Sequence, residues 1–127
     1  MPARLRDALI VLTWFALDQL TKLWAASGAL DAPLSLIPGF LRLSLSHNTG
    51  ALFGFLADAP DPWRSIALIA LPIGAVIIIG SLLWQAREED RLVRFALALI
   101  LGGALGNLTD RLVYGYVIDF IDVYAGW

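Results

Sequence analysis

Charged and amide side chains interrupt the apolar segments of this 127-residue chain at a few positions. Asp18 and Lys22 are four residues apart, so on a helix they share one face and could neutralise each other. Asn107, Asp110 and Arg111 have i, i+3 and i+4 spacing and also share a face. Charges in apolar surroundings are costly, so these residues need a reason to be there. They are either structural, forming an ion pair or an interfacial cap, or they support a functional site.

Asp119 lies in the apolar run Tyr116–Ile121. Burial there would disfavour the charged form of the carboxyl group, which suits it to general acid or base chemistry near neutral pH. The alternative is a surface aspartate on an edge strand. Together with Asp18 and Asp110, Asp119 provides the ingredients of an aspartic protease, in which two carboxyl groups share a proton. The spacing of these residues does not show which two of the three aspartates would form the pair.

The composition predicts that membrane helices position these residues. Hydrophobic residues make up 59% of the chain and charged residues 16%, and the mean hydropathy is +0.75. So few charges cannot cover the surface of a small soluble domain. The net charge of −2 argues against a nucleic-acid partner. The chain has no cysteine, and His47 is its single histidine, so we expect no disulfide, no metal site and no cofactor.

Three segments are long and apolar enough to cross a bilayer, and we expect helices over about 8–26, 64–85 and 92–112. The uncharged run Ile66–Trp84 alone would span roughly 28 Å as a helix. Gly102 and Gly106 form a G-x-x-x-G pair, which lets another helix approach closely. The first segment also resembles a cleavable signal peptide, although its two charges lie where such a peptide should be apolar.

The arginines predict the orientation of these helices. Most of them flank the first segment or the link between the second and third, which places the N-terminus in the cytoplasm by the positive-inside rule. The region of about 27–62 and the tail after Leu112 would then be extracytoplasmic. The alternating run Phe40–Ser46 predicts a short strand, and Asn48-Thr49-Gly50 predicts a turn. We therefore expect one membrane domain over 1–127: a mostly α, polytopic helical bundle with a small extracytoplasmic β-sheet.

Four segments, taken together and in this order, resemble the lipoprotein signal peptidases (signal peptidase II). They cover nearly the whole chain: Asp18-Gln19-Leu20-Thr21-Lys22, Asn48-Thr49-Gly50-Ala51-Leu52-Phe53, GGALGNLTDR from Gly102 to Arg111, and Val117-Ile118-Asp119-Phe120-Ile121. The last two segments are the most specific. The resemblance implies a membrane aspartic endopeptidase with four transmembrane helices. Such an enzyme removes signal peptides from prolipoproteins just before a diacylglyceryl-modified cysteine, in the bacterial inner membrane.

The resemblance also implies roles for individual residues. Asp119 matches the first aspartate of the catalytic dyad, and Asp110 a supporting aspartate with Asn107 and Arg111 beside it. Asn48 matches an asparagine near the substrate. Asp18 and Lys22 match the charged pair on the first helix of the family. The implied partners are a lipid-modified prolipoprotein and membrane lipids.

The sequence departs from the family pattern at one point. The family's second catalytic aspartate belongs to an F-N-x-A-D motif that opens a fourth helix, and nothing after Asp119 matches this motif. We therefore expect a truncated sequence with an incomplete dyad, which is inactive by itself. A different class of function, a small ion-coupled transporter or channel subunit, would instead place its carboxylates along a pore.

Overall fold

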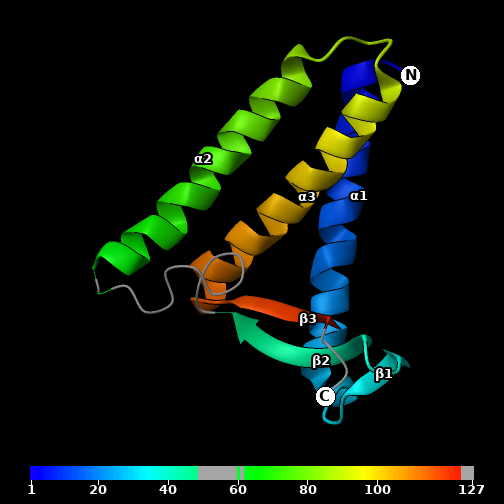
Figure 1. Ribbon diagram of the computed structural model, residues 1–127. Coiled ribbons are helices and arrows are strands. Elements are labelled where there is room, and N and C mark those ends of the chain that lie inside the picture. Colours follow the sequence, from blue (N-terminus) through cyan, green and yellow to red (C-terminus); the bar gives the residue numbers. More distant parts are fainter. Residues whose placement is uncertain (49–59, 61, 124–127) are drawn as a thin grey trace.

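The computed structural model describes residues 1–48, 60 and 62–123, and its helices form a bundle with a sheet across one end (Figure 1). The helices are α1 (Ala3–Trp24), which continues into a π-helical turn (Ala25–Ala29), α2 (Trp63–Gln85) and α3 (Arg91–Tyr114). The strands are β1 (Leu34–Ile37), β2 (Leu41–Asn48) and β3 (Val117–Val123). Within the described residues, three helices are long and apolar enough to cross a membrane. The predicted fold class is therefore confirmed.

Helix α1 begins at Ala3, earlier than the start that we expected near residue 8. Contacts of its first turns explain the difference. The Arg4 guanidinium lies 3.3 Å from the centroid of the Trp84 ring at the end of α2. Asp7 forms a buried ion pair with Arg94 of α3, and Arg94 also donates to the carbonyl oxygen of Ala86 at 2.6 Å. These contacts join the first turns of α1 to the α2–α3 link, so the helix extends beyond its apolar segment.

Helices α1 and α3 pack closely because glycines of α3 face α1. A Cβ atom added at Gly102 would lie 2.9 Å from the Val11 carbonyl oxygen and 3.0 Å from the Trp14 Cβ. Gly106 faces Asp18 in the same way. The close approach that the G-x-x-x-G pair predicts is therefore present. It also favours α1 as a retained helix of the bundle over a cleaved peptide.

The sheet lies at the end of the bundle opposite the N-terminus (Figure 1). In the described part of the chain it has three antiparallel strands in the order β1-β2-β3. The predicted strand over Phe40–Ser46 corresponds to β2, whereas β1 was not predicted, because its four residues give no clear alternation. Cross-strand neighbours Arg42 and Asp122 form an ion pair at 2.6 Å. Of the predicted turn at 48–50, residues 49 and 50 lie outside the described residues.

Candidate active site

Lys22 is the centre of a polar cluster between α1 and α3. Its ammonium Nζ lies 2.9 Å from Asp18 Oδ2, 3.0 Å from Asp110 Oδ2 and 2.9 Å from Asn107 Oδ1. A lysine has three N–H donors, so these three acceptors use all of them. Because the Lys22 side chain is only 7% exposed, these partners offset the cost of burying its charge.

The helical spacing produces this arrangement. Asp18 and Lys22 share a face of α1, and Asn107 and Asp110 share a face of α3, as their sequence spacing predicts. The glycine face of α3 brings the two faces together, because a methyl group at Gly106 would collide with the Asp18 carboxylate. Helix packing and the ion pairs therefore depend on each other.

Gln19 completes the cluster. Its amide nitrogen Nε2 is 3.1 Å from Asp18 Oδ2, 3.2 Å from Asp110 Oδ1 and 3.3 Å from the Gly106 carbonyl oxygen. The sequence offers Gln19 as part of the Asp18–Lys22 segment, but we assigned it no role. The polar side chain of Gln19 inside an apolar helix was the feature of the sequence that could have indicated its role.

Asp110 also joins the bundle to the sheet. Its side chain is 1% exposed, and Oδ2 accepts a hydrogen bond from the backbone N–H of Ile118 at 3.1 Å. With Gln19 on Oδ1 and Lys22 on Oδ2, both carboxylate oxygens have donors. Asp110 therefore fixes the start of β3 relative to α1 and α3.

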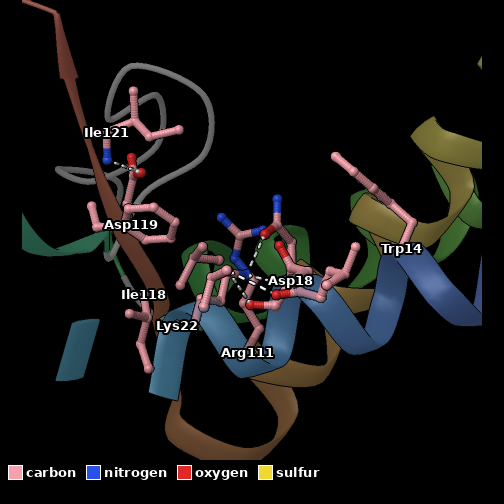
Figure 2. Close-up of a pocket in the computed structure, with 12 residues that line it drawn as sticks. Trp14, Asp18, Lys22, Arg111, Ile118, Asp119 and Ile121 are labelled. Atoms are coloured by element: carbon pink, nitrogen blue, oxygen red, sulfur yellow. Dashed lines mark hydrogen bonds and ion pairs between the residues drawn. The ribbon is translucent and has the colours of Figure 1, made fainter. Parts of the chain in front are cut away.

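A cavity of about 640 Å³ lies between this cluster and β3. Its polar lining comes from three elements: Asp18, Thr21 and Lys22 of α1, Asn107 and Arg111 of α3, and Asp119 of β3. Apolar walls are added by residues such as Trp14, Leu17, Ile118 and Ile121. Figure 2 shows Asp119 on the strand, set apart from the ion pairs around Lys22. The cavity thus combines an apolar wall with carboxylates from two elements.

Asp119 is exposed, which differs from the apolar surroundings that we expected for it. Val117, Ile118 and Asp119 at the start of β3 all line the cavity, but Val117 and Ile118 are buried there, whereas Asp119 is exposed. Its Oδ1 accepts the backbone N–H of Ile121 at 3.3 Å. Within the described residues, Asp119 has no cationic partner, unlike Asp18 and Asp110.

The other predicted site residues are placed as follows. Asn107 is exposed, although its Oδ1 accepts from Lys22, and Arg111 lines the cavity. Asn48 is the last residue of β2, and its backbone is paired with Val117 of β3. The register therefore puts Asn48 two positions from the Asp119 pair.

The chain is similar to known proteins over most of its length. The family model of signal peptidase (SPase) II matches residues 10–127. A lipoprotein signal peptidase of Solibacter usitatus is 43% identical over 112 residues, which cover 87% of this chain and 68% of that protein. One from Burkholderia mallei is 47% identical over 109 residues, which cover 86% of this chain and 64% of the relative.

Two solved structures share the fold of this chain. Two crystal structures described as bacterial membrane enzymes, determined by the in meso method, are each 27% identical to the chain. Their TM-scores are 0.73 and 0.75, over 93% of this chain and 70% and 74% of theirs. Against the curated relatives, the chain spans only about two thirds of their length. The match of the family model over nearly the whole chain, and these identities, establish that this chain belongs to the signal peptidase II family.

Proposed function

We propose that the protein is a membrane aspartic endopeptidase that removes signal peptides from diacylglyceryl-modified prolipoproteins. Family membership supports the reaction, and the apolar wall of the cavity suits a lipid-bearing substrate. The transporter alternative has no support, since Asp18, Asp110 and Asp119 gather at the sheet end of the bundle instead of following a pore. The observation that carries the proposal is that Asp119 of β3 lines the same cavity as the charged cluster around Lys22.

Asp119 is the catalytic candidate. Asp18 and Asp110 each bind the Lys22 ammonium through Oδ2, at 2.9 and 3.0 Å, so an oxygen of each is engaged in an ion pair. Asp119 lines the same cavity without an ion pair among the described residues. A carboxyl group that exchanges a proton must have a free oxygen facing the substrate, and Asp119 meets this condition. In the proposed reaction it takes a proton from the attacking water or donates one to the scissile carbonyl oxygen.

The remaining site residues have supporting parts in this proposal. Asp110, Lys22, Asp18 and Asn107 hold α1, α3 and β3 together, so that the cavity keeps its shape. Arg111 contributes positive charge to the cavity, and Asn48 contributes its amide to the substrate. The second catalytic carboxylate would come from the F-N-x-A-D motif, which these 127 residues do not contain. We therefore expect no cleavage by these residues alone.

The orientation follows from the same arrangement. The N-terminus and the α2–α3 link lie at one end of the bundle, and the sheet lies at the other (Figure 1). The arginines Arg4, Arg6, Arg87, Arg91 and Arg94 belong to the first end, which supports a cytoplasmic N-terminus. The cavity would then open on the extracytoplasmic side of the inner membrane.

The test uses the chain with a fourth helix carrying the F-N-x-A-D motif appended, in a gel assay of lipidated prolipoprotein cleavage. Asp119→Asn should abolish cleavage, because the amide has nearly the shape of the carboxyl group but cannot take up and release a proton as a catalytic carboxyl group does. Asp122→Asn is the matched control on the same strand. It removes the ion pair with Arg42 and should leave most of the activity. Cleavage by Asp119→Asn at the unmodified rate would disprove the assignment.

A further inference from the structure

The pairing of β2 with β3 contains a bulge beside Asp119. Leu43 pairs with Ile121 and Ser46 pairs with Asp119. Two residues of β2, Ser44 and Leu45, therefore oppose Phe120 alone. Such bulges are frequent next to active sites, where they change the direction of a side chain.

The bulge decides which side chains share the face of Asp119. Side chains alternate along a strand, and directly paired residues point to the same side of a sheet. Without the extra residue, the regular register would pair Leu45 with Asp119. With it, the hydroxyl of Ser46 takes that position. A shift of one residue thus exchanges an apolar neighbour of Asp119 for a hydrogen-bond donor.

We propose that Ser46 is a positioning residue for Asp119, placed opposite it by this bulge. The inference rests on the proposed function of Asp119. Directly paired residues have Cβ atoms about 4.5–5.5 Å apart, which is within reach of a hydroxyl-to-carboxylate hydrogen bond. Among the described residues, the Ser46 hydroxyl has no hydrogen-bond partner in the structure. Ser46 is exposed, so its hydroxyl is free to turn toward Asp119.

The effect of this contact is on the orientation of the carboxyl group. Asp119 Oδ1 already accepts the N–H of Ile121 at 3.3 Å, a long hydrogen bond that restricts the side chain weakly. A second donor from the neighbouring strand fixes its rotation and leaves one oxygen for the reacting water. Ser46 does not touch the substrate in this scheme, and it acts only through Asp119.

The first experiment tests the register without any activity. The chain has no cysteine, so introduced pairs can be read against an empty background. Paired positions in an antiparallel sheet have Cα atoms about 4.5–5.5 Å apart, which a disulfide can bridge. Under mild oxidation in membranes, Ser46→Cys with Asp119→Cys should crosslink. Leu45→Cys with Asp119→Cys, the pair of the regular register, should not, and the opposite result would overturn the proposal.

The second experiment measures the role of the hydroxyl. In the completed enzyme, Ser46→Ala should lower kcat about tenfold with KM nearly unchanged, the effect of one lost hydrogen bond. Ser46→Thr keeps the hydroxyl and should restore kcat. Ser44→Ala, the same change two residues away, should leave both constants unchanged. Equal effects of the two alanine variants, or no rescue by threonine, would refute a positioning role.

A third measurement separates this inference from the proposed function. If the unmodified enzyme cleaves no prolipoprotein, the proposed function fails, and the contact is then decided by thermal unfolding. Ser46→Ala and Asp119→Ala should change the melting temperature non-additively, because they remove the two partners of one contact. Ser44→Ala and Asp119→Ala should be additive. Additivity in both cycles would show that Ser46 does not hold Asp119.

Discussion

Gly106→Ala tests whether the contact of α1 with α3 depends on a missing side chain. The new Cβ would lie 2.7 Å from Asp18 Cγ and 3.4 Å from Gln19 Nε2, and it would collide with Asp18 Oδ2. The Asp18 carboxylate cannot move away freely, because it is bound to Lys22 and Gln19. Either the carboxylate leaves Lys22 or the two helices separate.

The loss of stability caused by Gly106→Ala can be compared with that of control glycine-to-alanine variants. Overpacking of this kind costs about 1–3 kcal/mol. The helix-propensity gain of alanine over glycine is similar at any interior helix position, so a control glycine removes it from the comparison. Among the described residues, the new Cβ at Gly103 would meet only Trp14 Nε1, at 3.8 Å, and at Gly80 it would meet nothing within 4 Å.

The measurement is unfolding of the purified protein by increasing SDS in a mild detergent, followed by circular dichroism. We expect Gly106→Ala to lower the free energy of unfolding by about 1–3 kcal/mol relative to Gly103→Ala. Gly103→Ala and Gly80→Ala should unfold like the unmodified protein or later. If Gly106→Ala unfolded together with the two controls, the close packing of α1 against α3 at Asp18 would be refuted.

Three further predictions follow from the buried charges and the orientation. Lys22→Met leaves the buried Asp110 and the half-buried Asp18 without their cation, so it should lower the free energy of unfolding by about 3–5 kcal/mol in the same assay. An effect no larger than that of a surface substitution would contradict the ion-pair network. Arg94→Met should lower the free energy of unfolding by a similar amount, because it leaves the buried Asp7 carboxylate unpaired. The double variant Arg94→Met with Asp7→Leu should recover much of this loss. If the losses of the two single variants simply added in the double variant, Asp7 and Arg94 would not be coupled. A single cysteine at Glu89 should be protected from a membrane-impermeant maleimide in spheroplasts and one at Ser35 should be labelled, the reverse pattern being incompatible with the proposed orientation.

The sequence predicts those parts of the site that depend on local geometry. Asp18 and Lys22 share a face because a helix has 3.6 residues per turn, and Asn107 and Asp110 share theirs for the same reason. The glycine pair of α3 indicates a close helix contact without naming the partner helix. These features made the bundle and the charged faces predictable.

Contacts between distant segments were not predictable from such patterns. Nothing local indicates that Lys22 reaches Asn107, 85 residues away, or that Asp7 pairs with Arg94. The exposure of Asp119 depends on the pairing of β3 with β2. The bulge that sets this pairing cannot be recognised from the alternation of apolar and polar residues along either strand. Long-range geometry decides these features, whereas the sequence pattern describes one element at a time.

The bond between Asp110 and Ile118 has a consequence for how the chain can vary over generations. The donor is a backbone amide, which every amino acid except proline supplies. Position 118 is therefore free to drift among residues that fit the same buried space, without loss of the link between membrane helix and strand. Position 110 has no such freedom, because its acceptor belongs to the side chain. The two ends of one hydrogen bond are thus under unequal constraint, and at position 118 only proline would remove the donor.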